Sequence, residues 1–375
     1  MRATLGFFAF LSVVIGTWTG LHYYVYCNLH AAGLPPGPLI GVLWALALSF
    51  PVSRVGALEL HGAAMRALNW VGSAWMGMGF LLAFWFFVAF LARRALVLAG
   101  FSGWAEPRPW ILGTAAAVIL IGARGIVRAL GGPKEVRYRV DRAARYGRGR
   151  EARIVQISDV HLGLILGIDY LRALVDRINA LEADLVLITG DFMDPEFPDD
   201  AGAAAQLKRI KARDGVFAVS GNHEFYAGIN RFLRLMESAG VAVLANESRV
   251  TASGLQIAGI HDQTAGRMPA NGISCDLGLA LSRIDTSRPS ILMAHQPKEL
   301  EPAAEKRVDL ILSGHTHAGQ IFPFRAVVRM AYRYLAGRHR IGPDTDLIVC
   351  TGTGFWGPPL RVGTDSQLVV VTLAY

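Results

Sequence analysis

Residues 153–163 read RIVQISDVHLG, a stretch that joins an aliphatic run to polar residues. Its first half, residues 153–158, has the aliphatic composition of a short buried strand. Asp159 and His161 follow at the point where that strand is expected to end. Side chains at strand ends of an α/β sheet project from a rigid scaffold into a common crevice, where ligand sites assemble. The stretch therefore predicts a buried strand that carries a polar site at its end.

Similar short aliphatic runs recur after residue 134 and alternate with amphipathic stretches. We expect further strands at residues 184–189, 216–220, 241–245, 255–260, 291–294, 308–313, 347–351 and 367–373. Helical periods lie between the early ones, at residues 170–181 and 229–238. Val136, Tyr138 and Val140 alternate with basic residues, as in a half-exposed strand. This alternation predicts an α/β domain over residues 134–375, a length that suits one domain.

Five polar blocks follow these predicted strands, and together they could form one dinuclear metal site. Oxygen donors come from Asp159, Asp191 and Asn222, and imidazole donors from His161, His295, His315 and His317. Seven ligands suffice for two divalent ions that share one carboxylate. Mixed oxygen and imidazole donors suit Mn²⁺, Fe or Zn²⁺ better than Ca²⁺, and the lack of cysteine ligands disfavours structural zinc.

The spacing inside the blocks supports this interpretation. Asp-x-His and His-x-His allow alternate residues to reach the same side of an extended segment. The glycines that precede Asp191, Asn222 and His315 are expected to permit tight turns close to the metals. Each block alone would be an ordinary turn, and His295 alone a hydrogen-bonded core histidine. The occurrence of all five at strand ends favours the metal site.

The blocks SDVHLG, GDFMD, GNHE, MAHQP and SGHTHAGQ resemble the signature of the calcineurin-like metallophosphoesterases over about residues 150–375. Residues 352–354 and 359–361 are similar to the end of the membrane-associated branch of that superfamily. The resemblance implies a sandwich of two mixed β-sheets flanked by helices. It also implies hydrolysis of a phosphoester at a dinuclear centre.

Carried over position by position, the resemblance assigns a role to each block. It implies that Asp159, His161 and His317 bind one metal, that Asn222, His295 and His315 bind the other, and that Asp191 bridges them. His223 is the implied catalytic residue, which faces the substrate phosphate as a general acid or transition-state stabiliser. The cofactors would be two divalent ions, Mn²⁺ before Fe or Zn²⁺. We interpret Glu224 as a supporting turn residue, and His261 and His339 as loop residues.

Residues 1–133 predict a transmembrane region. No charged residue occurs between Arg2 and Arg54, a distance that could cross a bilayer twice. Four helices are expected near residues 4–27, 38–53, 68–92 and 109–130, of which the second is short. A cleaved signal peptide is the alternative for the first. The predicted fold class is thus an N-terminal α-helical transmembrane region followed by the α/β domain.

The net charge of +8 is confined to the membrane part and its edge. Residues 1–133 hold eight Arg and two Glu, and residues 134–150 hold seven basic and two acidic groups. Residues 151–375 carry 22 basic and 25 acidic residues, a net −3, so no nucleic-acid partner is expected. The basic cluster at residues 134–150 is either a lipid-binding patch or a solvated strand face.

By the positive-inside rule that cluster predicts a cytoplasmic catalytic domain on a multi-pass protein of an inner or plasma membrane. Arg93, Arg94 and Arg108 favour the opposite orientation. A second basic stretch, from Arg325 to Arg340, could meet phosphate or lipid headgroups, with a solvated face as the alternative.

The expected partners are the bilayer and a phosphate-containing substrate. We expect a phosphodiester or pyrophosphate bond in a lipid-type or lipid-linked molecule to be hydrolysed. One alternative substrate is a soluble nucleotide or phosphomonoester, and one alternative function is non-catalytic sensing of metal or phosphate. Protein phosphatase activity is disfavoured, because residues 190–195 read GDFMDP where phosphoprotein phosphatases carry Asp-Arg-Gly after Gly-Asp.

Overall fold

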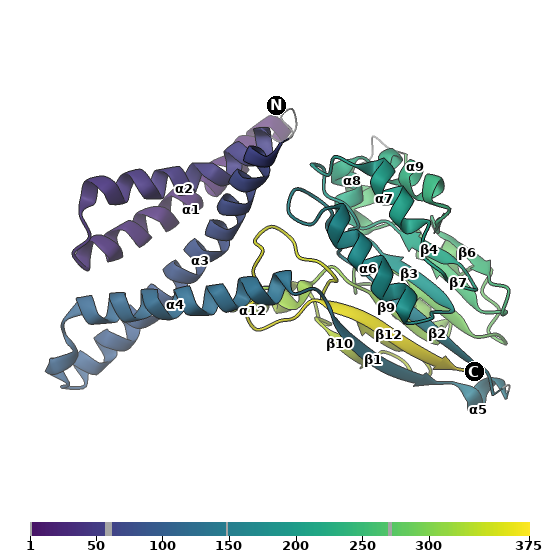
Figure 1. Cartoon of the computed structure of the whole chain (residues 1–375). Helices are drawn as coiled ribbons and strands as arrows, with labels where there is room; N and C mark the ends of the chain where they lie inside the picture. The colour runs from purple at the N-terminus through teal and green to yellow at the C-terminus, as the bar shows by residue number, and fades with distance from the viewer. Residues whose placement is uncertain (1, 57–61, 148, 269–271) are drawn as a thin grey trace. The chain divides into compact units, whose positions relative to one another are not determined.

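A computed structural model describes residues 2–56, 62–147, 149–268 and 272–375 (Figure 1). The chain divides into two compact units. Unit 1 comprises Met1–Arg128 with Gly357–Leu360, and unit 2 comprises Ala129–Trp356 with Arg361–Tyr375. Each unit has its own packing and is described by itself.

Unit 1 is built from long apolar helices. These are α1 (Arg2–Ala31), α2 (Pro36–Gly56), α3 (Ala63–Leu98) and α4 (Pro107–Leu130), with a short 3-10 helix at Ser102–Trp104. Polar groups join the first three helices: Trp75 Nε1 donates to His22 Nε2 at 2.9 Å, and Asn69 Nδ2 donates to Ser53 Oγ at 3.1 Å. Hydrogen bonds between helices are typical where the surroundings supply no water.

Helices occupy all four positions expected from the sequence. Among the described residues, three of them, α2, α3 and α4, are long and apolar enough to cross a membrane. The second helix, expected to be short, reaches 21 residues because it continues through Pro51 to Gly56. Many apolar side chains of unit 1 face outward, among them Trp44, Phe87 and Leu120, as expected for helices whose solvent is lipid.

Unit 2 contains two six-stranded mixed sheets. The first has the strand order β1 (Lys134–Asp141), β12 (Gln367–Ala374), β2 (Glu151–Ile157), β3 (Leu185–Thr189), β4 (Val216–Val219) and β5 (Ala242–Val243). The second has the order β10 (Gly337–Arg340), β11 (Asp346–Val349), β9 (Leu310–Ser313), β8 (Ser290–Met293), β7 (Gln256–Gly259) and β6 (Glu247–Val250). Strands β2 to β5 are parallel, as are β11, β9, β8 and β7, so each sheet has one polar edge where carboxyl ends meet.

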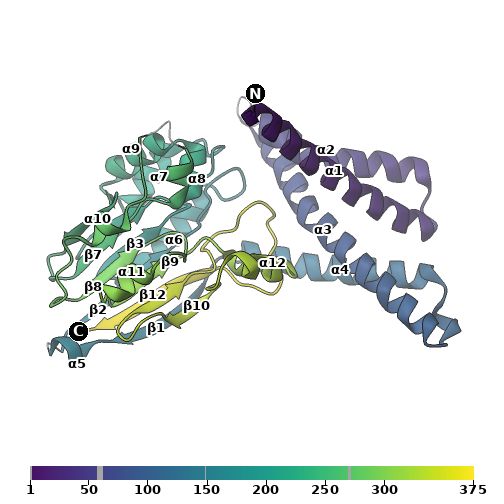
Figure 2. The same cartoon turned by 180° about the vertical axis from the view of Figure 1, so that it is seen from behind.

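The sheets form a sandwich with helices outside. A fully buried core between them contains Ile154, Leu187, Ile291 and Leu312. The outer face of the first sheet is covered by α6 (Ile168–Ala180), α7 (Asp200–Leu207), α8 (Asn222–Ala227) and α9 (Ile229–Ala239) (Figure 1). The second is covered by α10 (Leu277–Leu281) and α11 (Glu301–Glu305) (Figure 2). The predicted sandwich of two mixed sheets flanked by helices is confirmed.

Two edge strands, β6 and β10, were not expected. Residues 338–340 form part of β10 instead of a solvated loop, and His339 lies opposite Leu347 of β11. The pattern Arg-His-Arg carries no aliphatic signal, because one face of an edge strand can stay in water. Arg338 and Arg340 both pair with Asp346, which explains the basic composition of this strand.

The basic cluster at residues 134–150 is not a uniform patch. On β1 (Lys134–Asp141), Arg139 pairs with Glu151 at 2.6 Å on the exposed face, as in the solvated-strand interpretation. Arg142 is instead buried, with Nη2 2.6 Å from Asp346 Oδ2, and Arg145 bonds to Asp309 at 2.9 Å. Arg148 lies outside the described residues. At least two of the cluster's charges therefore stabilise the fold and do not face a lipid surface.

Candidate metal centre

The five polar blocks lie at the carboxyl ends of five parallel strands. Three belong to the first sheet, where Asp159 follows β2, Asp191 follows β3 and Asn222 follows β4. Two belong to the second sheet, where His295 follows β8 and the block from His315 follows β9. The two sheets thus contribute to one site, which no single block could form.

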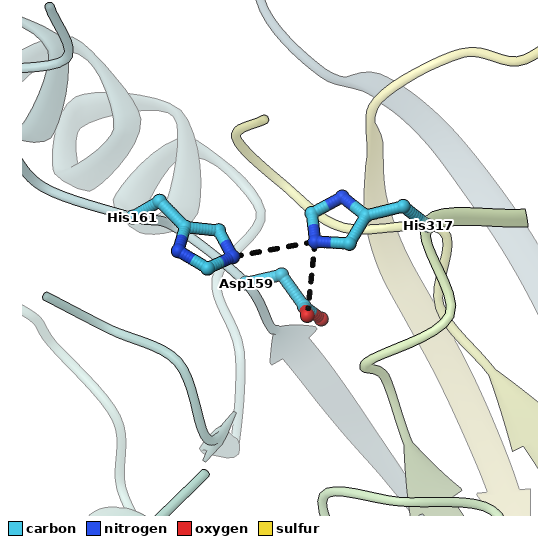
Figure 3. Close-up of side chains that lie close together, drawn as sticks. All are labelled: Asp159, His161 and His317. Atoms are coloured by element: carbon cyan, nitrogen blue, oxygen red, sulfur yellow. Dashed lines mark hydrogen bonds and ion pairs between the residues drawn. The ribbon is translucent and has the colours of Figure 1, made fainter. Parts of the chain in front are cut away.

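The first group of donors consists of Asp159, His161 and His317. One donor atom of each lies within 4.8 Å of the others (Figure 3). His317 Nε2 is 3.3 Å from Asp159 Oδ1 and 3.3 Å from His161 Nε2. Two imidazole nitrogens that face each other beside a carboxylate form a convergent set of donors of the kind a cation would complete.

The second group consists of Asp191, His295 and His315, again within 4.8 Å. Asn222 adds its carbonyl oxygen, 3.2 Å from His295 Nε2. Asp191 Oδ2 lies 3.2 Å from His295 Nε2 and 3.8 Å from His161 Nε2, which belong to different groups. Asp191 therefore stands between the two groups, the place that the predicted bridging role requires. All seven predicted ligands are brought together.

The backbone at this site is strained. Five of the seven predicted ligands have positive φ: Asp159 (52°), His161 (49°), Asp191 (50°), His315 (70°) and His317 (47°). Residues with a Cβ rarely adopt this region, and they keep it only where the surroundings over-determine it. Such strain is typical of functional sites, and here it turns alternate side chains toward one point.

Two of the three glycines next to the ligands are needed because a side chain would not fit there. Only one of the three makes the tight turn that was expected. Gly190 alone of the three has positive φ, at 86°. A Cβ at Gly221 would lie 2.2 Å from Asp191 Oδ1, and one at Gly314 would lie 2.2 Å from Asp159 Oδ2. These positions need glycine because two strand ends approach each other at the ligands.

The outer nitrogen of each predicted histidine ligand is also engaged. His161 Nδ1 contacts Asp194 at 2.9 Å, and His295 Nδ1 contacts the Thr189 carbonyl at 2.8 Å. His315 Nε2 lies 2.7 Å from the Tyr332 hydroxyl, and His317 Nδ1 lies 3.4 Å from Nη2 of the buried Arg361. Such partners fix ring orientation and tautomer in metal sites.

Sequence reasoning assigned no role to Asp194 or Tyr332. Asp194 lies in the GDFMD block, and its spacing of three from Asp191 was the available signal. Tyr332 lies in no recognised block. Arg361 lies in the PLR segment and is fully buried, where it donates to the carbonyls of Thr351 and Gly354.

Glu224 supports the loops that carry the ligands, as expected. Its carboxylate is fully buried and accepts hydrogen bonds from the backbone N–H groups of Asp191, Phe192 and Gly221. Burial and the nearby Asp191 carboxylate raise the pKa of Glu224 to about 7. Removal of this carboxylate would release the loops after β3 and β4 together.

His223 occupies the more exposed side of the site. Its backbone N–H donates to Asp191 Oδ1 at 2.8 Å, and its Nδ1 contacts Asp194 at 2.8 Å. Nε2 has no hydrogen-bond partner among the described residues. Tyr226 and Trp356 pack edge-on against the ring and are themselves exposed. Burial alone would lower the pKa of His223, but Asp191 and Asp194 outweigh it and raise the pKa to about 9.

The charges of the site fit a pair of divalent cations. Against the effect of burial, Asp191 raises the pKa of His295 well above its usual value, whereas burial and His295 lower the pKa of His315 to about 4. The two rings nevertheless face each other, His315 Nδ1 being 3.1 Å from His295 Nε2. The buried His295 imidazolium is stabilised by the nearby carboxylates alone. A metal ion at this position would take the place of the His295 proton.

The remaining singled-out histidines lie outside both groups. His261 is buried and bonds to Ser220 Oγ at 2.9 Å, while Asp262 accepts from Gln296 of the MAHQP block. His339 contacts the Ala336 carbonyl. The structure thus places neither His261 nor His339 among the predicted metal ligands, in line with the sequence.

Comparisons with known proteins identify the family. Residues 152–319 match the calcineurin-like phosphoesterase family. An uncharacterized metallophosphoesterase of Helicobacter pylori is 37% identical over 225 residues, which is 60% of this chain and 60% of that protein. One from Aquifex aeolicus is 34% identical over 228 residues, 60% of this chain and 86% of that protein.

A transmembrane protein with metallophosphoesterase domain from Danio rerio is 35% identical over 230 residues, 59% of this chain and 53% of that protein. The match thus spans little more than half the length of the Helicobacter and Danio relatives. It nevertheless covers most of the Aquifex protein. This chain belongs to the calcineurin-like phosphoesterases.

Proposed function

We propose that this protein is a membrane-anchored, dinuclear metal-dependent phosphoesterase. It hydrolyses a phosphodiester or pyrophosphate bond in a lipid-type or lipid-linked substrate. The observation that carries the proposal is the convergence of seven donor residues from five strand ends, with Asp191 between the two groups. His223 lies beside these donors. Its Nδ1 contacts Asp194, which leaves Nε2 on the other side of the ring.

The donor residues divide between two ions. Asp159, His161 and His317 would hold one, Asn222, His295 and His315 the other, and Asp191 both. Two divalent ions, Mn²⁺ in our proposal, supply Lewis acidity and a nucleophile formed from water. The chain itself holds its donors rigid through positive-φ backbone and outer hydrogen bonds, so little reorganisation is needed when substrate binds.

His223 is the proposed general acid. Asp194 accepts the Nδ1 proton, which leaves Nε2 to donate to the leaving oxygen of the substrate. The Asp194 carboxylate favours the protonated ring that this step requires, also where bound cations offset the charge of Asp191. Tyr226 and Trp356, whose exposed rings pack edge-on against His223, would contact the leaving group.

The lipid-type substrate is inferred from how unit 2 is tethered. Three helices are apolar enough to cross a membrane, and the last of them, α4, ends at Leu130. Strand β1 begins at Lys134, so three residues separate a candidate span from the catalytic domain. Such a linker reaches about 10 Å at most, which keeps the domain close to the bilayer surface.

We place the catalytic domain on the cytoplasmic side. The basic residues that follow α4, from Lys134 to Arg150, favour this side by the positive-inside rule. A reporter that works only in the cytoplasm, fused after Tyr375, should be active, while a reporter that works only outside should be silent. The reverse pattern would contradict the orientation and leave the chemistry untouched.

The substrate class is tested by a screen with metal-loaded full chain in detergent. We would compare lipid phosphates, lipid-linked pyrophosphates, nucleotides and small phosphomonoesters, each with wild type and Asp191→Asn. The proposal expects Asp191-dependent turnover of a lipid substrate well above that of the water-soluble compounds. Preference for a nucleotide would overturn the lipid-type substrate. Stoichiometric Mn²⁺ binding without any turnover would overturn the proposal that the protein is an enzyme.

A further inference from the structure

Helix α12 (Phe324–Ala331) lies on the surface of unit 2 and has no buried residue. It begins seven residues after His317, so the site and the helix are adjacent in the chain. Val327 is 55% exposed and Met330 is 88% exposed, the highest value of any large apolar side chain among the described residues. An apolar surface of this kind usually meets a partner or a membrane.

The same helix carries basic residues on its other side. Arg325 and Arg329 are spaced by four, which places them along one face of α12, whereas Val327 and Met330 lie on another. The sequence has no acidic residue from Ile321 to Pro343. Neither Arg325 nor Arg329 forms an ion pair with a described carboxylate, in contrast to Arg338 and Arg340, which pair with Asp346.

A tryptophan is fixed beside the start of α12. The side-chain amide of Gln320 donates to the main-chain carbonyl of Trp356 at 2.8 Å and accepts from the main-chain N–H of Trp356 at 3.1 Å. The Trp356 side chain is 52% exposed. Tryptophan is enriched at membrane interfaces, where its ring fits the boundary between headgroups and acyl chains.

We propose that α12 docks on an anionic bilayer, with Met330 and Val327 inserted at the headgroup boundary and Arg325 and Arg329 bound to lipid phosphates. An apolar face opposite a basic one is the pattern of an interfacial helix. A helix of eight residues is about 12 Å long, too short to bury the roughly 800 Å² per partner of a typical protein interface. The net positive charge of the segment selects an anionic leaflet.

Docking would bring the metal centre to headgroup level. Tyr332 follows directly on α12, and its hydroxyl contacts both His315 Nε2 (2.7 Å) and Gln296 (2.9 Å). The residue that follows the proposed lipid-binding helix therefore contacts a predicted metal ligand, His315. This consequence for substrate access rests on the proposed function, whereas the docking of α12 does not.

The test measures the depth of residue 330 in proteoliposomes of the full chain. In a background with Cys27→Ser and Cys275→Ser, Met330→Cys carries a nitroxide, and Cys350 stays because it is buried. The matched control is Leu279→Cys on α10, an apolar residue that is 59% exposed. In vesicles of phosphatidylcholine and phosphatidylglycerol, residue 330 should collide with oxygen more than with a water-soluble nickel chelate, and residue 279 should do the opposite.

Charge dependence provides the second arm. The pair Arg325→Gln and Arg329→Gln should reduce the docked population roughly tenfold or more, as should phosphatidylcholine alone. The pair Arg283→Gln and Arg288→Gln, with the same change in charge, should leave the depth unchanged. Equal access of the nickel chelate to residues 330 and 279 would overturn the proposal. Exclusion of both reagents from residue 330 would also overturn it, since a protein would then cover the helix.

The variant Asp191→Asn separates this inference from the proposed function. Its α12 should dock like that of wild type although hydrolysis is lost. Intact metal-dependent hydrolysis with an undocked helix would overturn the docking alone. Docking without hydrolysis in wild type would overturn the proposed enzyme alone.

Discussion

Nδ1 of His223 lies 2.8 Å from the Asp194 carboxylate, in a position where the His223 side chain is only 12% exposed. The same carboxylate oxygen contacts His161 Nδ1 at 2.9 Å. One buried carboxylate thus orients both the proposed general acid and a predicted metal ligand. Asp194 is therefore a positioning residue of the site.

Replacement of Asp194 by Asn should shift the alkaline limb of the pH–rate profile to lower pH. Asp194 helps to raise the pKa of His223 to about 9, so its loss lowers that pKa and the protonated acid disappears at a lower pH. The rate at neutral pH should fall roughly 10- to 100-fold. Steady-state rates across pH, with metal content measured alongside, check this. An unshifted limb would show that Asp194 does not set the charge of His223.

Replacement of His223 by Asn should slow turnover and spare the metals. A general acid contributes roughly 10²- to 10⁴-fold. His223 belongs to neither group of predicted ligands, although it also forms a cluster with His161 and Asp194 whose donor atoms lie within 4.8 Å of one another. Metal content by mass spectrometry and turnover of bis(p-nitrophenyl) phosphate are the two measurements. Loss of a metal in this variant would mean that His223 is a ligand and that its role is misassigned.

Tyr332→Phe should weaken metal binding by about tenfold, because it removes the partner of His315 Nε2. The matched control is Tyr334→Phe, two residues away, whose ring lies near that of His339 with a tilt of 51°. Titration of metal-free protein with Mn²⁺ gives both affinities. Equal affinities in the two variants would rule out a positioning role for Tyr332.

Arg361→Met should destabilise the fold, in addition to removing the outer partner of His317 Nδ1. The guanidinium is fully buried and donates to main-chain carbonyls at Thr351, Gly354 and Asp365. The Thr351 carbonyl would lose its donor, whereas those of Gly354 and Asp365 would keep the hydroxyls of Ser366 and Thr351. Each unsatisfied group costs about 1–3 kcal/mol, so the apparent melting temperature should fall by several degrees. Arg172→Met, at an exposed ion pair, is the control and should melt like wild type.

The sequence predicted the interior of the fold well, for a physical reason. Strands β3, β8 and β9, and β2 from Ile154 onward, are buried on both faces, so their largely aliphatic runs are easily recognised. The edge strand β10 reads Gly-Arg-His-Arg and was expected to be a loop, because its stability comes from pairing with β11 and from Asp346. The composition of the strand itself does not reveal such distant partners.

The candidate site shows the same division. Its donor residues follow strands in short blocks, and the structure brings all seven together. Asp194 and Tyr332 act through contacts with residues 33 and 17 positions away, which a single sequence cannot reveal. The expected turn glycine is found at Gly190, which has positive φ, but the need for glycine at Gly314 comes from Ser158 and Asp159 of a distant strand end.

The central claim is that two divalent ions held through Asp191 carry out phosphoester hydrolysis. The most direct measurement follows hydrolysis of bis(p-nitrophenyl) phosphate while Mn²⁺ is added back to metal-free full chain, in wild type and in Asp191→Asn. Wild-type activity should rise and saturate near two bound ions per chain, while Asp191→Asn should stay inactive and bind less metal. Hydrolysis without metal, or near-normal rates in Asp191→Asn, would contradict this claim.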